Sequence, residues 1–148
     1  MMNNHVMEKT PKVLTTIGLI LEGFAALGSL VSGILFINAE RFPFFDEIYA
    51  TVPTDEQWIF DLMTGIIGIV ILVIGIILGI VFVINLILFS KLIKGAYSEE
   101  KAKKVYKYQI IWGIISLFMN TLTGILYLIS GFQGFEGQKD HMNVREGL

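Results

Sequence analysis

The residue best placed for chemistry is Glu22, a carboxylate inside an apolar stretch that runs from residue 13 to 38. An ionisable group at such a depth in a membrane is a candidate proton or cation site. A low-dielectric layer favours the neutral carboxyl, which can donate a hydrogen bond to another helix. Asn120 and Thr121 are its predicted partners, because Asn120 lies at a similar distance from the same membrane boundary. No second ionisable group lies at that depth, which favours a structural tie over a relay.

The residue types needed for catalysis do not come together in this sequence. Nucleophilic catalysis needs a nucleophile, a base and an orienting group within hydrogen-bond reach. The chain has no cysteine, and the tails that hold its two histidines, His5 and His141, are predicted on opposite sides of a membrane. No carboxylate cluster with hydrolase spacing lies in the apolar stretches. The sequence therefore predicts no enzyme, no metal site and no cofactor.

The composition is that of a small membrane protein. Of 148 residues, 54% are hydrophobic and 16% charged, which is too apolar for a soluble domain. Residues 13–38, 59–89 and 108–132 are each long enough to cross about 30 Å of hydrocarbon. We expect an all-α fold, a single membrane domain over residues 1–148 built as a bundle of three transmembrane helices. Residues 59–89 could form a hairpin, but one helix is favoured because each arm would be too short to span.

Small and polar residues fall on one face of each predicted helix. Membrane helices turn such a face toward one another, because lipid offers no partner to a polar group. Gly75 and Gly79 also form a GxxxG pair. The residues predicted to pack against neighbouring helices are Gly18, Ser29, Gly33, Gly68, Gly75, Gly79, Gly113 and Gly124.

The two connections between the predicted helices differ in charge. Residues 39–58 hold five carboxylates and one cation, Arg41, whereas residues 90–107 hold six lysines. Lysine and arginine concentrate on the cytoplasmic side of membrane proteins. This asymmetry predicts the N-terminus inside, the 39–58 loop outside, the basic loop 90–107 inside and the C-terminus outside.

Local signals mark where helices begin and end near the basic loop. Gly95 suits a helix C-terminus, and Ser98 followed by two glutamates suits the start of the next helix. Tyr106, Tyr108 and Trp112 are interpreted as aromatic residues at the inner membrane boundary. The polar tail over residues 133–148 is predicted to be mobile.

Two segments resemble a known group of sequences. They are Glu8-Lys-Thr-Pro-Lys-Val-Leu14, which runs into Gly18, and Gly124-Ile-Leu-Tyr-Leu-Ile-Ser-Gly131. Both resemble a family of small uncharacterised membrane proteins, mostly from Gram-positive bacteria, that is classed as a domain of unknown function. The resemblance implies a few-helix bacterial plasma-membrane protein, and it brings no catalytic residue.

The function that these features favour is a non-catalytic accessory or protective membrane protein that binds another membrane component, such as a transporter subunit, a stress sensor or a toxin. The alternative is a small oligomeric channel or transporter with Glu22 in the conduction path, and an enzyme acting on lipid ranks third. The expected partners are the lipid bilayer and either another membrane protein or further copies in a homo-oligomer. No nucleic-acid partner is expected, because the charge segregation relates to orientation.

Overall fold

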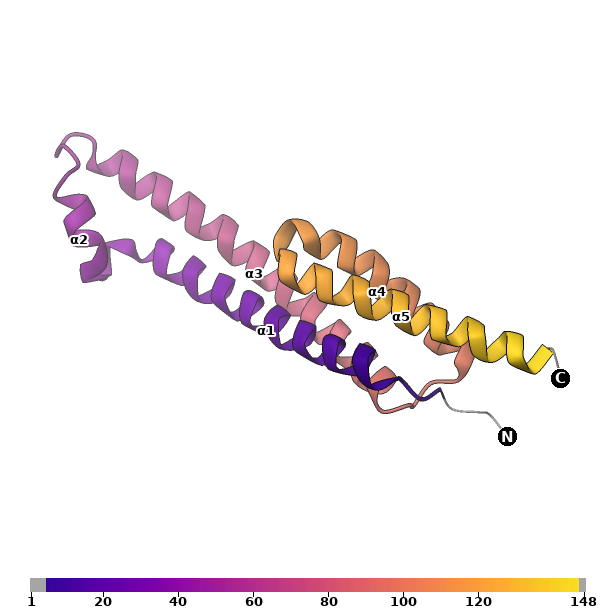
Figure 1. Cartoon of the computed structure of the whole chain (residues 1–148). Coiled ribbons are helices and arrows are strands. Elements are labelled where there is room, and N and C mark those ends of the chain that lie inside the picture. The colour runs from indigo at the N-terminus through magenta and orange to yellow at the C-terminus, as the bar shows by residue number, and fades with distance from the viewer. Residues whose placement is uncertain (1–4, 147–148) are drawn as a thin grey trace. The chain divides into compact units, whose positions relative to one another are not determined.

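The structure, a computed structural model, is all-helical over the residues that it describes, namely 5–146 for the backbone and 5–138 for the side chains. This confirms the predicted all-α class. The helices in chain order are α1 (Lys9–Ile37), the 3-10 turn η1 (Ala39–Arg41), α2 (Pro43–Tyr49), α3 (Gln57–Ile93), α4 (Glu99–Met119) and α5 (Thr121–Glu146) (Figure 1).

Two of these helices, α1 and α3, are long and apolar enough to cross a membrane. They have 29 and 37 residues, which correspond to about 44 and 56 Å at 1.5 Å per residue. The predicted stretch 59–89 lies within α3 without a break, so it is one helix and not a hairpin.

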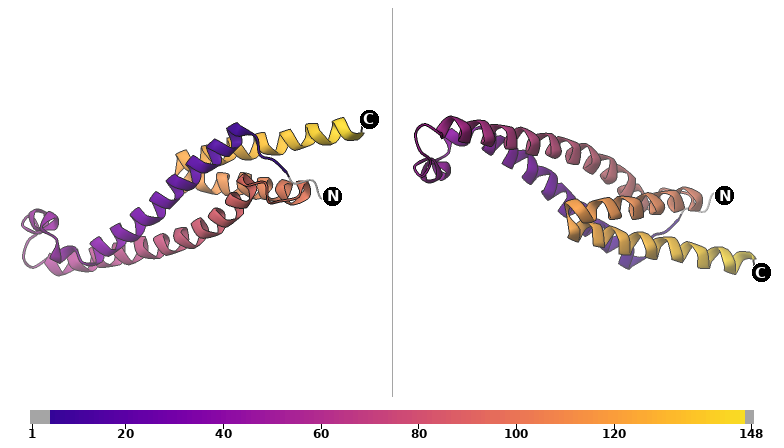
Figure 2. Two further views of the ribbon diagram at one scale, coloured as in Figure 1. Left: turned by 90° about the horizontal axis from the view of Figure 1, so that it is seen from below. Right: turned by 90° about the horizontal axis from the view of Figure 1, so that it is seen from above.

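The predicted third span, residues 108–132, is divided between two helices. α4 ends at Met119 and α5 begins at Thr121, and the two lie side by side as an antiparallel hairpin (Figures 1 and 2). Between them Asn120 leaves the helical region, with φ −149° and ψ 88°. Its Oδ1 accepts a hydrogen bond of 3.3 Å from the N–H of Thr123. Asparagine favours such helix starts because its side chain replaces a missing backbone acceptor.

The connection between α3 and α4 has the predicted signals. Gly95 has φ +67°, a conformation that glycine adopts at little cost. Its N–H donates to the carbonyl of Leu92 at 3.1 Å, and the N–H of Ala96 donates to the carbonyl of Lys91 at 2.9 Å. This pair of bonds is a Schellman motif and closes α3. Ser98 then precedes α4 in an extended conformation.

Two segments predicted as loop or tail are mostly helical. The basic loop 90–107 includes the end of α3 and nine residues of α4. The tail predicted to be mobile, 133–148, continues α5 as far as Glu146, and residues 147–148 lie outside the described residues. As far as Gln138, α5 packs along α4, so this part of the backbone stays helical despite two glycines, Gly134 and Gly137.

The chain divides into two compact units, which are described separately. The first unit contains Met1–Gly23 and Phe82–Leu148, and the second contains Phe24–Val81. In the second unit, glycines bring α1 and α3 together. A Cβ at Gly33 would lie 2.6 Å from the N atom of Leu72, and one at Gly68 would lie 2.6 Å from the N atom of Ile37.

The GxxxG pair of α3 is split by this packing. A Cβ on Gly75 would lie 2.8 Å from the N atom of Leu30, whereas a Cβ on Gly79 would meet nothing within 4 Å. Gly79 therefore differs from the prediction, since it makes no close helix contact within the chain. Ser29 is half-buried. Gly75 and Gly79 differ because two residues four apart are separated by about 40° around a helix axis, and only Gly75 faces α1 closely.

In the first unit, glycines bring α4 against α5 and α5 against α1. A Cβ on Gly124 would lie 2.8 Å from the carbonyl oxygen of Gly113, and one on Gly18 would lie 2.5 Å from a ring carbon of Tyr127. These three glycines thus lie at close helix contacts, as predicted. The apolar core around them consists of Met7, Leu19, Phe89, Leu92, Ala102, Val105, Tyr106 and Tyr127.

Candidate functional site

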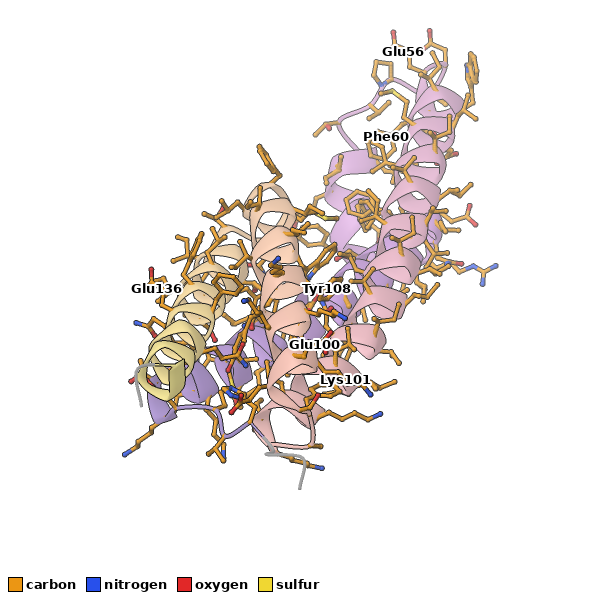
Figure 3. All side chains as sticks on the ribbon, turned by 90° about the vertical axis from the view of Figure 1, so that its right-hand side faces the viewer. Glu56, Phe60, Glu100, Lys101, Tyr108 and Glu136 are labelled. Carbon is orange, nitrogen blue, oxygen red and sulfur yellow. The ribbon has the colours of Figure 1, made fainter. Side chains whose placement is uncertain are left out.

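Glu22 is the centre of a buried polar cluster that joins four helices of the first unit. Its side chain is 5% exposed. Its Oε1 accepts hydrogen bonds from Asn85 Nδ2 on α3, at 2.7 Å, and from Trp112 Nε1 on α4, at 2.8 Å. Its Oε2 accepts a hydrogen bond from the Tyr127 hydroxyl on α5, at 2.7 Å. Tyr108 completes the cluster by donating to Asn85 Oδ1 at 2.7 Å, and Figure 3 labels its position on α4.

The direction of these bonds makes Glu22 an acceptor. An indole N–H can only donate, and the Tyr108 hydroxyl orients the Asn85 amide so that its NH₂ group faces Glu22. Both carboxyl oxygens are therefore occupied by neutral donors. Such a cluster ties α1 to three other helices, because removing its centre would leave several buried donors without a partner.

The predicted partners of Glu22 are not the ones that the structure has. Asn120 lies in the turn of the hairpin, and the hydroxyl of Thr121 donates to the carbonyl of Leu117 at 3.0 Å. Both residues serve the α4–α5 turn instead. The depth estimate was wrong because it assumed a single straight helix over 108–132, whereas the helix ends at Met119.

A second buried chain of hydrogen bonds lies on the same helices. Gln109 Nε2 donates to Thr15 Oγ1 at 2.9 Å, and Thr15 and Ser130 hydroxyls lie 2.6 Å apart. Since Ser130 donates its single proton to the carbonyl of Pro11 at 2.8 Å, Thr15 must donate to Ser130. The Oε1 atom of Gln109 is buried and has no partner among the described groups.

We expect Thr15→Val to destabilise the first unit by about 1 to 2 kcal/mol, because it leaves two buried groups unpaired at nearly constant volume. Thr16→Val is the matched control, since the exposed Thr16 hydroxyl only donates to the carbonyl of Lys12. Detergent unfolding followed by circular dichroism measures both variants. Equal stability of the two would contradict a role for the buried chain.

A third polar contact holds the N-terminal segment. His5 Nε2 lies 2.9 Å from the hydroxyl of Tyr106, and the two rings meet edge to face at 5.5 Å. Burial raises the pKa of Tyr106, and the neighbouring Glu8 carboxylate adds to this shift. The phenol is therefore neutral at pH 7, and the residues before α1 are fixed against α4.

The second unit has an apolar pocket of about 480 Å³. It is closed on one side by α2, which Pro43 begins at a position where the missing N–H costs nothing. The buried Phe45 ring meets Phe36 and Phe44 edge to face at 5.6 and 5.4 Å. The residues that line the pocket are Ser32, Leu35, Phe36, Phe44, Phe45, Ile48, Phe60, Met63, Thr64 and Ile67. Figure 3 labels Phe60 and Glu56 near the start of α3.

Neither region has the groups of a metal site. Among the described side chains, no group of three or more histidine or carboxylate residues could hold a metal ion. What the site residues can do is bind and position, either through the donors around Glu22 or through the apolar pocket.

Glu22 was predicted from the sequence, but the four residues that contact it or complete its cluster, Asn85, Tyr108, Trp112 and Tyr127, were not. Asn85 is the lone amide in the stretch 59–89, and that isolation is the signal that could have identified it. Tyr108 and Trp112 lie four residues apart, so they share a helix face. They were interpreted as residues at the membrane boundary, while the structure turns both toward the cluster.

No protein family, curated protein or solved structure matches this chain.

Proposed function

We propose that this chain is an integral plasma-membrane protein that crosses the bilayer with α1 and α3 and acts, without catalysis, by binding another membrane component. The observation that carries this proposal is the apolar pocket formed by α1, α2 and α3 in the second unit. The resemblance to small membrane proteins of Gram-positive bacteria is part of the same proposal.

The pocket has the size and chemistry of a site for a hydrocarbon group. Ligand sites are typically clefts of about 300–1,000 Å³ lined mainly by apolar and aromatic side chains, and 480 Å³ lies in that range. Eight of the ten lining residues are apolar or aromatic, with Ser32 and Thr64 as the exceptions. The Thr64 hydroxyl donates to the carbonyls of its own helix, which leaves little for a polar ligand.

Charge around the pocket favours a cationic head group on the ligand. Asp46 and Glu47 follow the lining residue Phe45 in α2, Asp61 follows Phe60 in α3, and all three are exposed. Arg41 is the only cation in residues 39–58. The proposed ligand is therefore a membrane amphiphile with an apolar tail and a cationic head.

Binding of a fluorescent alkyl trimethylammonium to the purified protein in nanodiscs tests this function. We expect saturable binding that is at least tenfold weaker for Ile67→Trp, because Ile67 lines the pocket and an indole would fill it. Ile66→Trp is the control, since this neighbour on the same helix does not line the pocket. An alkyl sulfate of equal chain length should compete poorly, because the exposed carboxylates that follow lining residues in α2 and α3 repel a like charge.

Equal binding to both tryptophan variants would remove the pocket from the proposal. Stronger competition by the alkyl sulfate would contradict the charge argument alone. Recovery of the protein from the soluble fraction after expression, without detergent, would overturn the membrane assignment itself.

The alternative of an oligomeric channel with Glu22 in its path is less well supported. Glu22 is 5% exposed, and both of its oxygens accept bonds from neighbouring helices of the same chain. A conducting carboxylate needs access to the ion. The arrangement therefore favours a structural Glu22.

A further inference from the structure

The turn end of the α4–α5 hairpin carries exposed apolar side chains. Phe118, in the last turn of α4, is 90% exposed. Other large apolar residues around the turn are also exposed, namely Ile114, Ile115, Met119, Leu122 and Ile125. Apolar surface of this extent requires a partner.

The opposite end of the hairpin is basic. Lys103 and Lys107 of α4 place their ammonium groups 5.5 and 5.9 Å from the centre of the Phe135 ring of α5. Lys101 and Lys104 are exposed on the same helix, and Lys101 is labelled in Figure 3. The hairpin is thus apolar at its turn and carries four lysines at its base, of which Lys104 pairs with Glu100 at 2.8 Å. Lysines at this position suit an element that meets anionic lipid headgroups.

Near Gln138, α5 lies beside the residues at which α1 and α4 begin. Gln138 Nε2 donates to the carbonyl of Glu99, the first residue of α4, at 3.2 Å. A Cβ on Gly137 would lie 3.4 Å from a carboxyl oxygen of Glu8, just before α1. Residue 138 therefore lies beside the starts of both α1 and α4.

The apolar part of the hairpin is too short to cross a membrane. From Lys107 to Asn120 there are 13 helical steps, or about 20 Å at 1.5 Å each. The hydrocarbon core is about 30 Å thick. An element of this length can reach the middle of the bilayer from one side. Because it cannot reach the other side, the chain must return to the side from which it entered.

Four hydrogen bonds join polar groups of the turn within the hairpin, while the buried Thr123 Oγ1 has no partner among the described groups. The N–H of Asn120 donates to the carbonyl of Ser116 at 2.7 Å, and its carbonyl accepts from the N–H of Gly124 at 3.0 Å. The side chains of Asn120 and Thr121 bond to the N–H of Thr123 and the carbonyl of Leu117. Internal bonding of this kind is what hydrocarbon requires of a backbone turn.

We propose that the α4–α5 hairpin is a re-entrant membrane element, whose partner is the acyl chains of the leaflet on the lysine-bearing side. It enters there with Asn120 foremost and returns, so that α5 around Gln138 lies on the same side as the start of α1. This replaces the sequence-based expectation of a C-terminus on the opposite side. The inference rests on the proposed membrane location of α1 and α3.

Single cysteines in vesicles test the hairpin, since the chain has no cysteine of its own. Glu136→Cys should react with a membrane-impermeant maleimide from the same side as Ala96→Cys, with Thr54→Cys reacting from the other side. All three positions are exposed. A spin label on Phe118→Cys should be accessible to oxygen and protected from a water-soluble nickel complex, while one on Ala96→Cys should show the reverse.

Labelling of Glu136→Cys from the Thr54 side would overturn the re-entrant hairpin and restore a third span. A Phe118 label accessible to the nickel complex would place the turn in water, and one protected from both reagents would indicate a protein partner. Either result would overturn insertion into lipid. If Ala96→Cys and Thr54→Cys react from one side, the failure lies with the two-span proposal and not with the hairpin.

Discussion

Glu22→Leu is expected to destabilise the first unit more than any other single change to its polar clusters. The leucine fills most of the space but accepts no hydrogen bond, so Asn85, Trp112 and Tyr127 each lose an acceptor. At about 1 kcal/mol or more for each unpaired buried donor, the expected loss is about 3 kcal/mol. Detergent unfolding measures this loss, and Trp112 fluorescence reports the cluster in a Trp58→Phe background, since the chain has two tryptophans.

Glu22→Gln is the matched control. The amide oxygen can accept the two bonds that Asn85 and Trp112 make to one oxygen of Glu22, and its NH₂ can donate to the Tyr127 hydroxyl, which turns to accept. We therefore expect a loss below about 1 kcal/mol. If Gln and Leu destabilise equally, the charge of the carboxylate matters and the hydrogen-bond account is wrong.

The same glutamine variant separates the two functions considered for this chain. A structural Glu22 predicts no proton flux through reconstituted wild-type protein under an imposed pH gradient. Flux that Glu22→Gln abolishes would favour the channel, because an amide does not titrate in the accessible range.

Glu22 itself could be predicted from the sequence, but its hydrogen-bond partners could not. A carboxylate in an apolar stretch can be recognised from the sequence, because the hydropathy and length of the stretch are local properties. Its partners depend on where the other helices begin and end. The predicted helix over 108–132 is broken at Asn120, so every membrane depth estimated along it was wrong. Hydrophobic periodicity does not detect a helix break of one residue.

The packing faces illustrate a second limit. Helical periodicity correctly placed Gly18, Gly33, Gly68, Gly75, Gly113 and Gly124 at close contacts. It could not distinguish Gly75 from Gly79, because both lie on the small-residue face. Which of them meets another helix depends on the crossing geometry, and that property belongs to two helices together.

The second large expected effect is a difference in stability between two leucine substitutions one turn apart, Gly75→Leu and Gly79→Leu. Gly75→Leu is expected to separate α1 from α3 in the second unit, because the new side chain would collide with the backbone at Leu30. Backbone cannot move aside as a side chain can, so the expected cost is about 3 kcal/mol, the upper end for overpacking. Gly79→Leu meets open space and replaces glycine by a better helix former, so stability should be unchanged or slightly higher.

Thermal or detergent unfolding of the two variants, followed by helical circular dichroism, gives the comparison. A cysteine pair across the α1–α3 contact, monitored by crosslinking, reports separation of these helices directly. Equal destabilisation would show that Gly79 also lies against a helix within the chain, contrary to the structure. If Gly79→Leu leaves monomer stability intact but abolishes a dimer in lipid, this glycine belongs to a contact between two copies, and the homo-oligomer, one of the two expected protein partners, is supported.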